Sequence, residues 1–78
     1  MGNQGEAEAR FQEALDLARR QGARSLELRA AISLSRLWAD RGRGEEARQV
    51  LAPVYESFTE GLESPDLKTA RALIGDLR

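Results

Sequence analysis

The chain contains no histidine and no cysteine, which limits the chemistry that its side chains could carry out. Nucleophile–base pairs that need imidazole or thiolate, and zinc sites built from His and Cys, cannot be assembled from it. Carboxylates remain as candidate ligands for a hard cation, in the pair Glu45 and Glu46 and in the set Glu60, Glu63 and Asp66. Because the Gly-punctuated ligand loop of an EF-hand is missing, we interpret these acids as helix caps and solvated surface and expect no metal site.

A phosphate-binding loop is missing as well. The segment Gly42-Arg43-Gly44 is too short for one and lacks the Lys-Ser/Thr ending that would contact the phosphates. With no candidate for a nucleophile, a general base or a phosphate cradle, we expect a protein that is not an enzyme and needs no cofactor.

The charge pattern argues against nucleic acid and membranes as partners. The formal net charge is −1, and the arginines alternate with acids instead of forming a basic patch. No apolar run approaches the roughly 20 residues that cross a bilayer. Since cysteine is absent and the first residues lack an apolar signal core, we expect a cytoplasmic protein.

Apolar residues recur at helical spacing and no strand pattern competes with them, so we predict an all-α fold. A single domain should span residues 1–78, with four helices at about 3–21, 25–41, 44–60 and 65–77 joined by short connections into antiparallel hairpins. We expect Gly22 to stop the first helix, and Ser25 and Ser64 to cap the second and fourth. Pro53 predicts a bend near 49–53.

The second helix is expected to lie centrally, because its apolar residues spread over two sides. One side carries Leu26, Ala30, Leu34 and Leu37, and the other carries Leu28, Ala31, Ile32, Ser35 and Trp38. The other helices each have one apolar stripe. The stripe of the first helix is Ala7, Phe11, Ala14, Leu15 and Ala18. That of the third is Ala47, Val50, Leu51, Val54 and Phe58, and that of the fourth is Leu67, Ala70, Leu73, Ile74 and Leu77.

The pattern repeats after forty residues. Shifting the chain by this distance places Gly2, Glu6, Ala7 and Phe11 on Gly42, Glu46, Ala47 and Leu51, and Ala30, Leu34, Ser35 and Leu37 on Ala70, Ile74, Gly75 and Leu77. Small residues meet small ones and large apolar residues meet large apolar ones. A fixed period of this length is typical of helical-repeat arrays, which act by presenting a surface.

The segment from Ala31 to Val54 resembles a tetratricopeptide repeat. The first-helix positions of that motif fall on Ala31, Leu34, Ser35 and Trp38, the turn on Gly42, and the second-helix positions on Ala47, Leu51 and Val54. The first helix carries the second-helix signature at Gly2, Ala7, Phe11 and Ala14. The period of forty departs from the family's thirty-four, and Thr59 replaces the motif's final Pro.

A closer resemblance covers almost the whole chain. The runs 25–31, 51–55, 58–61 and 65–68 look like the extreme C-terminus of bacterial multidomain regulators. These join a class III adenylate/guanylate cyclase domain, or another output domain, to a large ATPase module and a tetratricopeptide array. The resemblance implies a piece of a longer protein, with a final repeat and a capping helix in a right-handed superhelix and nothing catalytic.

In a tetratricopeptide array the first helices of the repeats line a concave groove. The resemblance therefore implies a partner-binding face, made of Arg29, Ile32, Arg36 and Ala39 with Thr69, Ala72 and Asp76 opposite. Arg29 and Arg36 are seven residues apart and could clamp a carboxylate or an acidic peptide. Alternatively, Arg36 forms an ion pair with Asp40, and Arg29 contacts solvent or the surroundings of Glu27.

Two functions remain open. The first is a non-catalytic protein-interaction or scaffolding module at the C-terminal end of a repeat array, which binds a protein or peptide. The alternative is a structural cap or self-association segment of a larger signalling ATPase or cyclase. Leu15 and Leu17 lie about 200° apart on a helix, so they cannot both turn inward. We therefore expect open apolar surface, which allows a homodimer through the first helix. Alternatively, the first helix closes over the core and exposes only small alanines.

Overall fold

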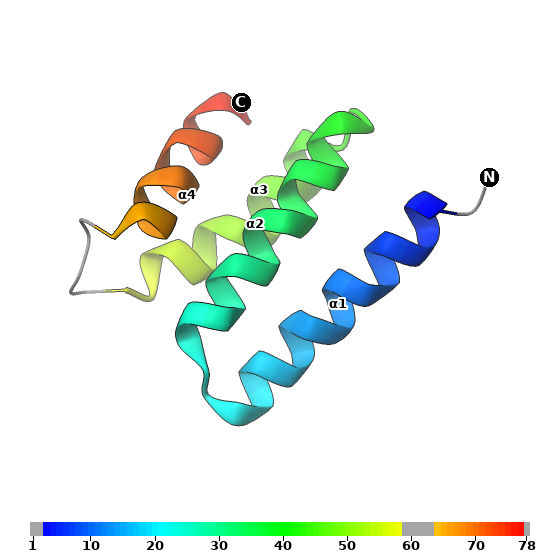
Figure 1. The fold of residues 1–78 in the computed structure, drawn as a ribbon. Coiled ribbons are helices and arrows are strands. Elements are labelled where there is room, and N and C mark those ends of the chain that lie inside the picture. The colour runs from blue at the N-terminus through cyan, green and yellow to red at the C-terminus, as the bar shows by residue number, and fades with distance from the viewer. Residues whose placement is uncertain (1–2, 59–63, 78) are drawn as a thin grey trace.

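The computed structural model describes residues 3–58 and 64–77, and the side chains from residue 5 onward within these ranges. This part of the chain is all-helical and contains no strand, which confirms the predicted class. Figure 1 shows its four helices, which are α1 (Asn3–Gln21), α2 (Arg24–Asp40), α3 (Gly44–Glu56) and α4 (Pro65–Asp76). The third helix ends at Glu56, before the expected end near 60, and 59–63 lie outside the described residues.

Helix α2 lies at the centre of the molecule, as its two-sided apolar pattern predicted. It packs against each of the other three helices, with α1 and α4 on opposite sides of it and α3 behind it in the view of Figure 1. Within the described residues, α4 also packs on α3, whereas α1 contacts no helix except α2. One face of α1 is therefore left without a helical neighbour.

Consecutive helices run antiparallel, and side-chain contacts fix their direction. At one end of the α1–α2 pair Arg41 bonds Glu8, and at the other end Arg19 bonds Glu27. Between α2 and α3, Ser35 reaches the carbonyl of Ala47 near the beginning of α3. Arg24, at the beginning of α2, donates to the carbonyl of Ser57 just after α3.

The core forms where α2 meets its neighbours. Leu28, Leu34 and Leu51 are fully buried, and Trp38 is buried with them, as its place on an apolar side of the second helix predicted. The rest of the buried cluster is Leu15, Ala30, Ala31, Ile32, Ala47, Val54, Leu67, Ala70 and Leu77. Phe11, Val50, Phe58, Leu73 and Ile74 pack against this cluster as partly buried residues.

Helices α2 and α3 approach each other closely at two small residues. Ser35 and Ala47 are both 0% exposed. The Ser35 hydroxyl lies 2.7 Å from the carbonyl oxygen of Ala31 and 3.1 Å from that of Ala47, so its single proton is shared between the two helices. A larger side chain at either position would push the helices apart.

The turns explain where the helices begin and end. Gly22 and Gly42 have φ angles of 66° and 77°, which confirms the left-handed stop predicted at Gly22. The expected cap at Ser25 is wrong, because α2 begins one residue after Ala23 with no side-chain cap. Backbone bonds from Gly22 to Arg19 and from Ala23 to Ala18 already close this turn, so the chain enters α2 before Ser25.

The fourth helix begins as predicted. Ser64 is the N-cap, its Oγ accepts the backbone N–H of Leu67 at 3.2 Å, and Pro65 occupies the first helical position. In α3, Pro53 lies inside a continuous helix and is exposed. Its carbonyl accepts the N–H of Ser57 at 3.1 Å, so helical bonding continues beyond it, and the bend at 49–53 stays a prediction.

Candidate protein-binding surface

The structure places the residues of the expected concave face at different depths. Arg29, Arg36, Ala72 and Asp76 are exposed, and Ala39 and Thr69 are half-buried. Ile32 is only 6% exposed and belongs to the core cluster, so a partner cannot reach it in this structure. This face is therefore mainly polar, with charged side chains at its accessible positions.

The two arginines of this face have different surroundings. Arg29 donates through Nε to Asp66 at 3.0 Å, a pair between α2 and α4 that the sequence analysis did not consider. Glu27, considered as a neighbour of Arg29, pairs instead with Arg19 at 3.1 Å. Arg36 forms no ion pair with any described residue, so the alternative pairing with Asp40 is not formed.

A second surface is apolar and lies between α1 and α2. We call it the α1–α2 groove, and its volume is about 330 Å³. Its lining residues are Phe11, Ala14, Leu17, Ala18, Gln21, Leu26, Arg29, Ala30 and Ser33. Leu17 is 52% exposed and Leu26 is 53% exposed, and they are the large apolar residues that the described surface leaves open. Arg29 belongs to both this groove and the expected concave face.

The groove exists because α1 is covered on one side only. Leu15 and Ala18 turn toward α2 and are 4% and 3% exposed. Leu17 points away from Leu15 and stays open, which confirms that these two residues cannot both turn inward. Ala14 and Leu26, expected in buried stripes, are exposed, because no described helix covers that side of the α1–α2 pair.

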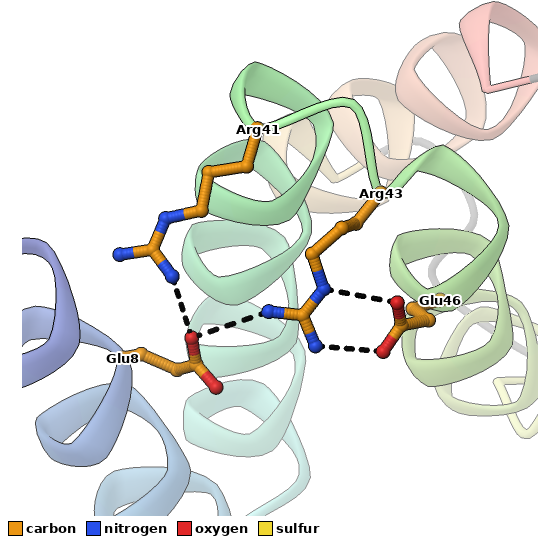
Figure 2. A network of polar contacts seen from close by, with 4 residues as sticks. All are labelled: Glu8, Arg41, Arg43 and Glu46. Atoms are coloured by element: carbon orange, nitrogen blue, oxygen red, sulfur yellow. Dashed lines mark hydrogen bonds and ion pairs between the residues drawn. The ribbon is translucent and has the colours of Figure 1, made fainter.

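A polar network fastens α1 to the turn between α2 and α3 (Figure 2). Glu8 of α1 accepts from Arg41 at 2.8 Å and from Arg43 at 3.5 Å through the same carboxylate oxygen. Arg43 also holds Glu46 with two bonds, of 2.9 and 2.7 Å. Arg43 lies over the Trp38 ring, 4.8 Å from its centroid. With the Arg19–Glu27 pair at the far end, this network fixes both walls of the groove.

The Arg43–Glu46 pair shifts the pKa of both its members. The hydrogen bond from Arg43 holds the pKa of the Glu46 carboxyl below its usual value, and this effect outweighs the opposing effect of desolvation. The same hydrogen bond raises the pKa of the Arg43 guanidinium. Both groups therefore stay charged at neutral pH, and the network is electrostatic.

The carboxylates considered as cation ligands do not gather in the described part of the chain. No group of three or more acidic side chains close enough to hold a metal ion occurs among those residues. Glu45 and Glu46 lie in the first turn of α3, where the helix dipole favours acids, and Asp66 lies in the first turn of α4. Glu60 and Glu63 lie outside the described residues.

Comparison with known proteins gives no family for this chain: no family model, curated protein or solved structure matches it. No helix in the described ranges is both long enough and apolar enough to cross a membrane.

The sequence predicted open apolar surface on the first helix but did not place Leu26 beside it, although the forty-residue period contains a signal for this groove. Leu17 corresponds to Ser57 after this shift, and Leu26 corresponds to Asp66. At two positions, therefore, the first unit carries leucine where the second carries a polar residue. Such an exchange indicates a surface that faces an apolar neighbour in the first unit and a polar neighbour in the second.

Proposed function

We propose that this chain is a non-catalytic protein-interaction or scaffolding module, which forms the C-terminal end of a helical-repeat array of the tetratricopeptide type. The observation that carries the proposal is the open apolar groove between α1 and α2, with two half-exposed leucines. Contiguous apolar surface is costly to leave in water and commonly marks a site where another protein binds.

The arrangement of the walls supports this function. Ion pairs hold both ends of the α1–α2 pair, so the groove is preformed and little ordering is needed when a partner binds. Arg29 lies at the groove and Arg36 lies one heptad further along α2, so basic groups flank the apolar surface. An apolar centre with a charged rim is the usual anatomy of a protein interface.

Self-association is the second candidate function, and the same groove favours it. A chain that exposes Leu17 and Leu26 in isolation can bury them against a copy of itself in a two-fold symmetric contact. Light scattering after size exclusion separates the two candidates. A dimer that forms with rising concentration favours self-association, and a monomer that binds a different protein favours the interaction module.

The proposed function is tested by comparing which proteins bind to the intact chain and which bind to a groove variant. The variant carries Leu17→Lys and Leu26→Lys, and Gln12→Lys on an exposed position outside the groove is the matched control. We expect a partner that binds the intact chain and the control but not the groove variant, confirmed with the purified partner. Identical binding by all three proteins would contradict the proposal.

A further inference from the structure

The internal repeat indicates what kind of partner fits the α1–α2 groove. A shift of forty residues places α1 on α3 and α2 on α4. The α3–α4 pair is covered by α2, which packs against both of these helices. The corresponding surface of the α1–α2 pair has no described helix on it.

The contacts of α2 with the α3–α4 pair map onto the groove. Ser35 bonds the carbonyl of Ala47, which corresponds to Ala7. Arg24 donates to the carbonyl of Ser57 and lies 5.1 Å from the centroid of the Phe58 ring. Arg29 bonds Asp66 at 3.0 Å. The last three contacted residues correspond to Leu17, Ala18 and Leu26, and all three line the groove.

The residues of α3 beneath α2 are more deeply buried than their counterparts in α1, as expected if α1 lacks a covering helix. Ala47, Leu51 and Val54 are 0%, 0% and 4% exposed beneath α2. Their counterparts in α1 are more open, since Ala7 and Phe11 are half-buried and Ala14 is exposed. The first unit thus has the same small and large apolar positions, uncovered.

We infer that the α1–α2 groove binds an amphipathic helix from outside residues 1–78, which lies on it as α2 lies on α3 and α4. This inference rests on the proposed function and names the partner of the same site. A folded second copy does not supply such a helix, because the matching face of its own α2 is buried, with Ala31 and Ser35 at 0% exposure.

The groove also specifies the chemistry of that helix. It needs a small residue where α2 has Ser35, because α1 carries the small residue Ala7 at the point of closest approach. It needs an apolar residue where α2 has Arg29, because Leu26 replaces the Asp66 carboxylate that binds this arginine. It needs another where α2 has Arg24, because Ala18 replaces the Phe58 ring over which Arg24 lies and Leu17 adds an exposed apolar side chain. The partner thus resembles α2 with its two arginine positions made apolar.

The test compares two labelled peptides with the sequence of α2, 24–40, by fluorescence anisotropy with the full chain. One has the native sequence, and the other carries Arg24→Leu and Arg29→Leu. We expect the leucine peptide to bind at least about tenfold more tightly, because two more apolar side chains are buried against Leu17 and Leu26. Equal binding of the peptides, preference for the native one or no binding at all would overturn the inference.

A charge exchange in the groove sharpens the test. Leu26→Asp gives the groove the acidic group that Arg29 contacts at Asp66. This variant should lose about tenfold or more of its affinity for the leucine peptide and gain affinity for the native one. Gln12→Lys should change neither affinity. A preference that is unchanged in Leu26→Asp would show that the peptides bind elsewhere.

The outcomes separate this inference from the proposed function. A partner whose binding depends on Leu17 and Leu26, combined with failure of the leucine peptide, overturns the helical partner alone. If the groove variant binds the same partners as the intact chain and the leucine peptide also fails to bind, the proposed interaction function is contradicted as well. A dimer that blocks the groove and excludes the peptide overturns the inference in favour of a second copy.

Discussion

At the scale of single residues, the contact between Ser35 and Ala47 sets how closely α2 and α3 pack. Both residues are completely buried, and the shared hydroxyl proton connects the backbones of the two helices. Small residues are required here by geometry, because neither side chain has space to become larger. A stability measurement is the direct way to test this contact.

Ala47→Leu should destabilise the protein by about 1 to 3 kcal/mol, because the added side chain has no space between α2 and α3. Urea unfolding followed by circular dichroism measures the change. Ala9→Leu, at an exposed position of α1, is the matched control and should change stability little. An Ala47→Leu protein that unfolds at the wild-type urea concentration would show that the helices do not meet there.

Arg29→Glu combined with Arg36→Glu tests whether the basic rim selects an acidic partner. Arg29 takes part in an exposed ion pair with Asp66, and such pairs contribute only about 0–1 kcal/mol, so helicity should persist. Binding of any acidic partner should be abolished by the change of charge. Titration of that partner is the measurement, and an unchanged affinity would remove these two residues from the interface.

At the scale of the helices, the order and the buried faces followed from sequence periodicity, while two kinds of detail did not. Ser25 failed as a cap because backbone bonds of the Gly22 turn already complete the helix start. Leu26 and Ala14 failed as buried residues because periodicity identifies an apolar face without saying whether a neighbour covers it. The Arg29–Asp66 pair was missed because its members are far apart in sequence.

The pair of Arg43 and Glu46 predicts a pH dependence at the beginning of α3. The folded-state pKa of Glu46 lies below its unfolded value, so the pair stabilises the fold above the ordinary carboxylate pKa of about 4.3. This contribution is lost as the pH falls through the lower, folded-state value. Unfolding free energies of the wild type and Glu46→Gln should therefore differ at neutral pH and converge in acid.

Urea unfolding at several pH values measures this convergence. Glu45→Gln is the control, because Glu45 lies in the same helical turn and forms no ion pair among the described residues. A constant difference between wild type and Glu46→Gln from neutral to acid pH would show that the carboxylate does not act through its charge.

At the scale of the whole molecule, the chain is a slab of helices, 18 Å thin in its shortest dimension, in which α1 packs against no other described helix than α2. The α3–α4 half is covered by α2, whereas no described helix covers the corresponding face of the α1–α2 half. Figure 1 shows α1 at the edge of the molecule beside α2. This asymmetry, more than any single side chain, connects the forty-residue repeat with the proposed binding function.

The groove leucines should matter for binding and little for folding. Leu17→Lys with Leu26→Lys changes two half-exposed side chains, so the melting temperature followed by circular dichroism should stay close to that of the wild type. Concentration-dependent association, where light scattering detects it, should be lost. A large drop in melting temperature would mean that these leucines belong to the core.

The most direct test of the central claim is a map of amide chemical shifts in the full chain as the Arg24→Leu, Arg29→Leu peptide is added. If the α1–α2 groove binds a helix, the largest shifts should cluster at its lining residues, including Leu17, Leu26 and Ala30. Shifts concentrated on α3 and α4 would show that the peptide replaces α2 instead. That result, or the absence of shifts, would contradict the binding of such a helix in the groove.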